Sequence, residues 1–423
     1  MGSADGVRLD TLDNGIRVLT EEASGLCSAS LGIWVENGSR HEAPAHAGAS
    51  HFLEHLLFKG TERRNAREVA QAIEDVGGVI NAFTGKEYTC YYAKVLPEHL
   101  DVAIDVLSDI FLHSTLPPDE VERERSVVEQ EIVQGEETPD DHVHDRFVNA
   151  LWGDHPLGRP IAGTVDSIAA LTRDHLWAFK HDRYRPNRVL VAGAGPIAAE
   201  RLRAAWQATL GSFDGSGDEE VADAPEPRGG LEVVDRALDQ AHVCLGVPGL
   251  AAADPDRYAA HVLNLALGGG MSSRLFQEIR EERGRAYSVY SYLSSFGDGG
   301  YLGIYVGTSP EWVAEVVDIS RSVMRSVSED GLRPEEIERA KSQMKGNLLL
   351  GLDSSDNRMS RIARSLLTLG TIPSIGEMCA LIDAVTSEDV QRVAARTIGA
   401  DLLCATVLGR VDEPRLRTET GLA

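Results

Sequence analysis

The sequence predicts an α+β protein of two homologous domains, each a largely antiparallel sheet with helices packed on one face. Three observations predict this fold class: the length of the chain, a polar stretch near its middle, and the same order of motifs on either side of that stretch. A chain of 423 residues is too long for one ordinary core, and its 43% of hydrophobic residues provide enough apolar side chains for two.

The two domains are expected over residues 1–213 and 231–423. The residues between them, 214–230, are polar, acidic and rich in Gly and Pro, as exposed linkers are. Motifs recur across this linker at a nearly constant offset. PEHLDVAIDVL begins at Pro97 and its counterpart PEWVAEVVDIS at Pro310, whereas PDEVERERS begins at Pro118 and its counterpart PEEIERAKS at Pro334. Such spacing indicates an internal duplication.

Within each copy, strands are expected early and late, with helices between them. Asn14-Gly15 is a hairpin turn signal between two strand-like pieces, and Gly77-Gly78 closes an amphipathic helix. In the first domain the expected order is a hairpin, a strand, two helices, paired strands and three more helices, of which the first five elements lie at residues 12–22, 29–37, 48–60, 66–78 and 79–96.

The composition argues against several classes of function. A formal net charge of −25 repels nucleic acid and anionic lipid, so we expect neither nucleic acid nor a membrane as a partner. No basic segment followed by an apolar run opens the chain, and no run of 18 apolar residues occurs in it, so we expect neither secretion nor a membrane span. The scattered cysteines without C-x-x-C spacing predict neither a disulfide framework nor a cysteine zinc site, which favours the reducing cytoplasm: Cys27, Cys90, Cys244, Cys379 and Cys404.

The segment GASHFLEHLLFKG, residues 48–60, has the pattern of an apolar helix and nevertheless carries His51, Glu54 and His55. Residues i, i+3 and i+4 lie on one face of a helix, so both imidazoles can point at one zinc ion while Glu54 lies beside it as a base. The alternative is a satisfied core histidine with the other two groups on a solvated rim. That alternative suits a lone histidine, whereas three such groups in one apolar helix favour zinc.

The pattern H-x-x-E-H is the inverted zinc motif, and the chain resembles the pitrilysin-like metallopeptidases over nearly its whole length. It is most similar to their bacterial two-domain branch, which resembles the mitochondrial processing peptidase. The resemblance implies one zinc ion per chain, held by His51, His55 and Glu131, the last of which lies far downstream on another expected helix. It also implies that Glu124 supports the ligands and that Glu54 takes a proton from the attacking water.

The second copy keeps a histidine, His261, opposite His51 and lacks the other groups. In HVLNLALGGG, Asn264 and Leu265 stand where the first copy has Glu54 and His55, and Asn347 stands where it has its third ligand. The carboxy-terminal domain is therefore expected to keep the scaffold without the metal.

Two further sets of residues follow from the resemblance. Arg280 and Tyr287 match the family's Arg/Tyr pair, which would hydrogen-bond the substrate carbonyl and stabilise developing negative charge; considered alone, they are a surface charge and a sheet aromatic. Asn81, Ala82 and Phe83 match the strand to which an extended peptide adds through main-chain hydrogen bonds.

These expectations together predict a zinc-dependent endopeptidase that hydrolyses peptide bonds in unfolded or short peptides, a processing peptidase being one form of it. Two alternatives stay open: a non-catalytic assembly or core-subunit-like protein of the same fold, and a maturase dedicated to one partner protein. In four-domain relatives the zinc lies in the first domain and the Arg/Tyr pair in the last, which implies that this shorter chain forms a homodimer.

Overall fold

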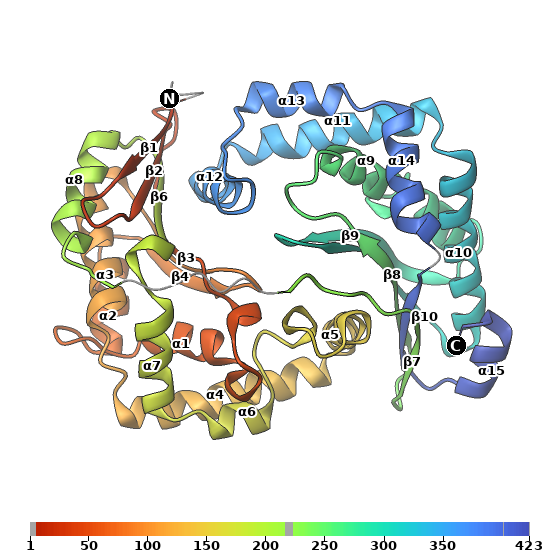
Figure 1. The fold of residues 1–423 in the computed structure, drawn as a ribbon, viewed down its shortest axis with the longest axis horizontal. Coiled ribbons are helices and arrows are strands. Elements are labelled where there is room, and N and C mark those ends of the chain that lie inside the picture. Colours follow the sequence, from red (N-terminus) through yellow and green to blue (C-terminus); the bar gives the residue numbers. More distant parts are fainter. Residues whose placement is uncertain (1–5, 216–222, 401, 423) are drawn as a thin grey trace. The chain divides into compact units, whose positions relative to one another are not determined.

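The computed structural model describes residues 6–215, 223–400 and 402–422, and the part of the expected linker at 216–222 lies outside the described residues. The chain forms two compact units, which confirms the predicted α+β fold of two domains (Figure 1). Among the described residues, unit 1 comprises 6–134, 159–215 and 349–374, and unit 2 comprises 135–158, 223–348, 375–400 and 402–422.

Unit 1 is built on a six-stranded sheet in the order β1-β2-β6-β3-β5-β4. Only the β2–β6 pair is parallel among its described pairings, and the other neighbours are antiparallel. Its strands are β1 (Val7–Thr11), β2 (Arg17–Glu22), β3 (Ala29–Val35), β4 (Val79–Thr84), β5 (Thr89–Val95) and β6 (Val189–Gly195). Its helices are α1 (Ala49–Leu57), α2 (Ala66–Glu74), α3 (Leu100–His113), α4 (Pro118–Glu137, which continues past the unit boundary), α6 (Val165–Ala170), α7 (Arg173–Arg183), α8 (Ala199–Leu210) and α12 (Ser355–Leu369).

Unit 2 repeats this plan with a five-stranded sheet in the order β7-β11-β8-β10-β9. Here too one pair, β7–β11, is parallel and the remaining described pairs are antiparallel, so each strand has a counterpart in unit 1. Its strands are β7 (Gly230–Asp235), β8 (Ala241–Gly249), β9 (Ala286–Ser295), β10 (Gly300–Thr308) and β11 (Cys404–Gly409). Its helices are α5 (Pro139–Trp152), α9 (Arg257–Gly268), α10 (Val313–Asp330), α11 (Pro334–Gly351), α13 (Ile375–Asp383), α14 (Ser387–Thr397) and α15 (Glu413–Thr420).

The sheet of unit 1 is covered on both faces. In β6, Val189 and Val191 point into the core formed with α1, α3 and α7, whereas Leu190 and Ala192 pack with α12 on the opposite face. Successive side chains of a strand point to opposite faces, and this explains why VLVAGAG is apolar throughout. Most of the described helices thus lie on one face, as predicted, and α12 lies on the other.

Neither unit is one continuous stretch of sequence. The sequence predicts domains at residues 1–213 and 231–423, but α12 of the second half belongs to unit 1, and α5 of the first half belongs to unit 2. Figure 1 shows α12, coloured as part of the second half, beside β2 and β6. The reason is that each sheet has a second apolar face, and each of these helices offers an apolar stripe that fits it.

Ion pairs, two of them to a buried carboxylate, hold α12 on its sheet. The carboxylate of Glu21 in β2 is 1% exposed and accepts hydrogen bonds from Arg358 at 2.6 Å and Arg361 at 3.0 Å. At the start of the helix, Lys94 pairs with Asp356 at 2.9 Å. A buried carboxylate held by two guanidinium groups fixes the orientation of α12 as well as its position.

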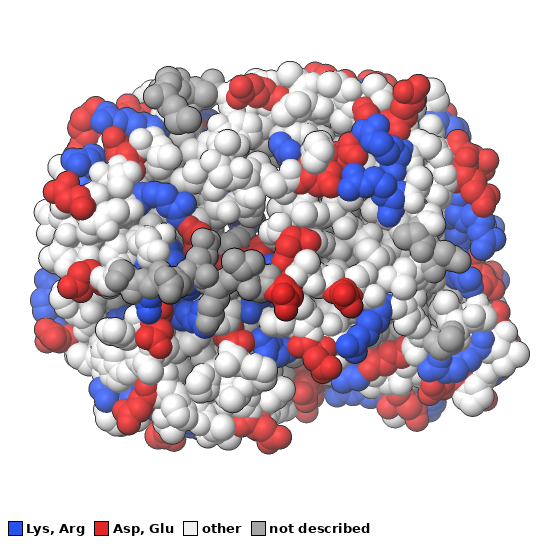
Figure 2. Space-filling view, in the orientation of Figure 1, with Lys and Arg blue, Asp and Glu red and all other residues white. Residues whose placement is uncertain are grey.

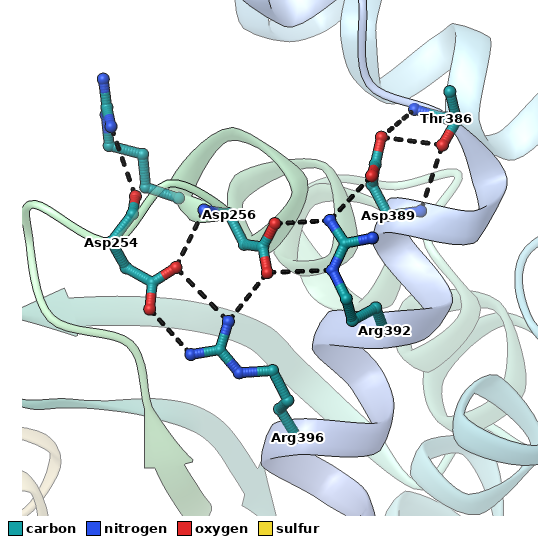
Figure 3. A network of polar contacts seen from close by, with 7 residues as sticks. Asp254, Asp256, Thr386, Asp389, Arg392 and Arg396 are labelled. Atoms are coloured by element: carbon teal, nitrogen blue, oxygen red, sulfur yellow. Dashed lines mark hydrogen bonds and ion pairs between the residues drawn. The ribbon is translucent and has the colours of Figure 1, made fainter.

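Unit 2 has an exposed network at the start of α9 (Figure 3). Asp256, which precedes α9, accepts from Arg392 at 2.6 Å and Arg396 at 2.8 Å, and Arg396 also binds Asp254. Both arginines lie on α14, which begins with Thr386 as its N-cap. The network therefore ties α14 to the start of α9, the counterpart of α1.

The surface carries both signs of charge. On the face drawn in Figure 2, the described Lys and Arg side chains are interspersed with Asp and Glu and form no broad basic area. Among the helices of the described ranges, none is long and apolar enough to cross a membrane.

Glu21→Ala should destabilise unit 1, because it leaves the two arginines of α12 without their buried partner. We expect a loss of up to roughly 3–5 kcal/mol in the free energy of unfolding, measured by urea denaturation. Glu200→Ala is the control, since Glu200 forms an exposed pair with Arg8 and its side chain is 73% exposed. Equal stability of the two variants would contradict the role assigned to Glu21.

Candidate metal centre

The start of α1 is held by a buried carboxylate. Glu42 accepts hydrogen bonds from the backbone N–H groups of Gly48 at 2.8 Å and Ser50 at 2.7 Å. Burial raises the pKa of Glu42 to about 7, although these hydrogen bonds oppose the rise. Gly48 has φ +90°, and a Cβ there would stand 2.5 Å from the carbonyl oxygen of Ala162. Glu42 therefore satisfies the amides of the N-cap residue and of Ser50 in the first turn of α1, where the chain turns at a glycine.

The apolar and polar residues of α1 separate onto two faces. Phe52, Leu53, Leu56 and Leu57 are fully buried. The imidazoles of His51 and His55 are 19% and 18% exposed, which places both at the rim of the core. The sequence pattern thus gives a helix anchored by its leucines with both histidines accessible along one edge.

His51, His55 and Glu131 are brought together by α1 and α4. Oε2 of Glu131 lies 3.8 Å from Nε2 of His51 and 3.5 Å from Nε2 of His55, and one donor atom from each residue falls within 4.8 Å of the others. Donors sharing one tetrahedral zinc ion at about 2.0–2.2 Å stand roughly 3.3–3.6 Å apart. Two imidazole nitrogens and a carboxylate oxygen at these distances fit a zinc ion.

The protonation of His51 suits metal binding. Burial, assisted by the charge of His55, lowers the pKa of His51 to about 4. The imidazole is then neutral near pH 7, as a metal ligand must be. Its Nδ1 is buried and has no hydrogen-bond partner among the described residues.

His55 has the support that His51 lacks. Nδ1 of His55 lies 3.2 Å from Oε2 of Glu124. Glu124 lies on α4, two turns before Glu131, in a stripe whose other buried residues are Val121, Val128 and Ile132. The same helix therefore supplies one carboxylate to each nitrogen of the His55 ring, and the Glu124 contact is the one that the supporting role proposed for this residue requires.

Glu54 lies beside this group and not within it. Its Oε2 accepts a hydrogen bond of 2.5 Å from the hydroxyl of Thr84 in β4. Burial raises the pKa of the Glu54 carboxyl and nearby Glu131 adds to the rise, whereas the Thr84 hydrogen bond and His55 lower it. Thr84 was not among the predicted site residues. The signal available in the sequence was its place directly after Phe83 on the same strand.

The predicted peptide-binding strand is an edge strand. β4 is the last strand of its sheet and pairs with β5 alone among the described strands, with Asn81 exposed and Ala82 and Phe83 partly buried. The Ala82 N–H donates at 2.8 Å to the side chain of Asn81. An edge strand offers main-chain groups to a further strand.

Arg280 and Tyr287 contact each other in unit 2, whereas the three candidate ligands belong to unit 1. Arg280, in a π-helix at Phe276–Glu281, donates to the Tyr287 carbonyl at 2.7 Å and lies 4.8 Å from the centroid of its ring. In the β9–β10 pairing, Gly307 lies opposite Ser288 and Thr308 lies opposite Ala286, so Tyr287 is the extra residue of a β-bulge. Its side chain is 79% exposed. Bulges commonly redirect a side chain out of a sheet.

The equivalent positions of unit 2 carry no comparable cluster among the described residues. Asn264 and Leu265 lie on α9 and Asn347 on α11, where unit 1 has its acidic and imidazole groups. In the described part of unit 2, no three His, Cys, Asp or Glu side chains converge as the candidate ligands do.

Comparisons with known proteins place the chain in a family. The sequence profile of insulinase (peptidase family M16) matches residues 17–165, and that of the peptidase M16 inactive domain matches residues 170–344. An uncharacterized zinc protease of Streptomyces coelicolor is 45% identical over 406 residues, covering 93% of this chain and 87% of the relative. The uncharacterized zinc protease YmxG of Bacillus subtilis is 41% identical over 397 residues, covering 94% and 97%.

Solved structures share the fold. A peptidase M16 inactive domain from Pseudomonas fluorescens superimposes with a TM-score of 0.88 at 21% identity, covering 95% of this chain and 97% of that one. A protease from Helicobacter pylori gives 0.88 at 23%, covering 95% and 99%. A chain of Complex III2 from Candida albicans gives 0.85 at 22%, covering 98% and 100%. The profile and the close relatives confirm the resemblance seen in the sequence: the chain belongs to peptidase family M16.

Proposed function

We propose that this protein is a zinc-dependent endopeptidase that hydrolyses peptide bonds in short or unfolded peptides. The convergence of His51, His55 and Glu131, with Glu54 beside them, is the observation that carries the proposal. Two relatives that are 45% and 41% identical are named zinc proteases, which supports zinc as the metal.

The chemistry can be assigned to residues of this chain. A bound zinc ion supplies Lewis-acid polarisation of a peptide carbonyl and makes a water molecule more acidic. The Thr84 hydroxyl donates to Oε2 of Glu54, and we assign to the Glu54 carboxylate the transfer of a proton from the attacking water to the leaving amine.

The proposed substrate class, short or unfolded peptides, is supported by the position of β4 at the edge of its sheet. A peptide that pairs with this edge must be extended, and main-chain hydrogen bonds discriminate little between side chains. Short or unfolded peptides meet this requirement, and a folded domain does not.

A role as a non-catalytic assembly protein is the alternative, because the fold also occurs in a chain of Complex III2. The complete donor set in unit 1 favours an enzyme. A maturase dedicated to one protein would use the same chemistry, and profiling of cleavage across a proteome would distinguish it from a peptidase of general specificity.

Glu54→Gln should leave the zinc content unchanged, whereas Glu131→Gln should lower it. Glu54→Gln removes the base and should keep zinc while turnover falls about 10²–10⁴-fold. Glu131→Gln should lose zinc, because a neutral amide oxygen is a poor zinc ligand. Elemental analysis, together with cleavage of a quenched unstructured peptide, measures both effects.

Glu129→Gln, on α4 like Glu131, is the control and should change neither zinc content nor turnover. If Glu54→Gln lost zinc in parallel with activity, Glu54 would be a ligand. If Glu131→Gln bound zinc and cleaved normally, the assigned ligand set would be wrong.

Cleavage should depend on the unfolding of the substrate. A stable domain should be cut slowly when folded and rapidly when a destabilising substitution unfolds it, because only the unfolded chain can pair with β4. Gel analysis of both forms at equal concentration is sufficient. Equal rates would rule out strand pairing as the mode of binding.

We also propose that the protein works as a homodimer in which Arg280 and Tyr287 of one protomer serve the site of its partner. Mixing Glu54→Gln protomers with Tyr287→Phe protomers, under conditions of subunit exchange, should restore activity. A mixed dimer has one doubly altered site and one with both groups intact. If exchange is demonstrated and activity does not return, the pair acts within its own chain.

A further inference from the structure

Lys59 contacts the carboxylate that lies behind the candidate metal centre. It follows α1, four residues after His55, and its Nζ lies 2.7 Å from Oε1 of Glu124. The other oxygen of Glu124 lies 3.2 Å from Nδ1 of His55. One carboxylate therefore connects an ammonium group to an imidazole whose remaining nitrogen faces Glu131.

Burial makes this contact different from a surface ion pair. Glu124 is 4% exposed, and Lys59 and His55 are the partners of its carboxylate in the described structure. A desolvated carboxylate needs a charge-balancing partner, and removal of that partner favours a rotamer that turns toward water. Such a turn would take Oε2 away from His55.

We propose that Lys59 is a positioning residue for the metal centre. By holding Oε1 of Glu124, it keeps Oε2 against Nδ1 of His55, and the hydrogen bond at Nδ1 aims Nε2 at the point where the three candidate ligands meet. The proposal rests on the proposed function. It assigns a role to a residue that contacts neither ligand nor substrate.

The second copy offers an internal comparison. At the offsets that align the two halves, Gly269 stands opposite Lys59 and Ala340 stands opposite Glu124. The half without metal-binding residues thus lacks both members of the pair. A purely structural ion pair would be equally useful in either copy, so the joint loss supports a role connected with the metal.

The geometry also explains why His55 needs this support. No described residue hydrogen-bonds the buried Nδ1 of His51. Of the two ligand imidazoles, only that of His55 is oriented through its Nδ1 by a described residue. That contact comes from Glu124, whose other oxygen is held by Lys59.

Zinc affinity of the metal-free protein, measured by competition with a chelator, tests the proposal by a double-mutant cycle. Lys59→Met keeps most of the side-chain length without the charge and should weaken zinc binding by about 10-fold, at the lower end of the 10–100-fold loss usual for such outer residues. Glu124→Gln should weaken binding at least as much. The double variant should be no weaker than Glu124→Gln alone, because Lys59 acts through Glu124.

Two further variants serve as controls. Lys59→Arg retains the charge and should keep most of the affinity. Lys345 is a matched lysine in unit 2: its side chain is 31% exposed, against 29% for Lys59, and it pairs with Asp383. Lys345→Met should leave zinc binding unchanged. Circular dichroism of each metal-free variant reports folding, and Lys59→Gln replaces the Met variant if that one does not fold.

Unchanged affinity in Lys59→Met, or losses that add fully in the double variant, would overturn the positioning role while leaving the proposed function intact. Failure of the unaltered protein to bind zinc would instead overturn the proposed function and this inference with it.

Discussion

The meeting of α1 and α4 is the constraint on which the candidate site depends. α1 must bury Phe52, Leu53 and Leu56 and still present two imidazoles, and α4 must bury Val128 and still present Glu131. In both helices the apolar residues recur every three to four positions and form one buried stripe, which leaves the polar residues on the other face. Core packing of the two helices therefore positions the candidate ligands, and the rigidity of that core keeps the distances between them fixed.

Glu124 shows how closely packing and chemistry are joined. It occupies a core position of α4 between Val121 and Val128, where an apolar residue would be expected. A carboxylate at that position is tolerated because His55 and Lys59 both contact it. The same contacts give the imidazole a fixed orientation, so the cost of burying a charge is offset at the place where orientation is needed.

Duplication explains the architecture and also the specialisation of the two units. The sheets share one order of pairing, and an exchanged helix, α12 or α5, lies on the second face of each. Unit 1 holds the candidate ligands and the open edge of β4. Unit 2 keeps His261 opposite His51 but has Asn264, Leu265 and Asn347 at the other corresponding positions, and it instead presents the Arg280 and Tyr287 pair at its own edge strand. One scaffold thus carries two different sets of polar groups.

The sequence by itself determined the local features. Helical period placed His51, Glu54 and His55 on one face, the constant offset between motifs identified the duplication, and the resemblance identified Glu131 on a distant helix. Tertiary structure decided what no local pattern contains. An apolar stripe does not specify which sheet it will cover, so the exchange of α5 and α12 could not be predicted from the periodicity of either helix. Thr84 and Lys59 were missed for the same reason: a threonine in a strand and a lysine after a helix are ordinary residues until folding places them against Glu54 and Glu124.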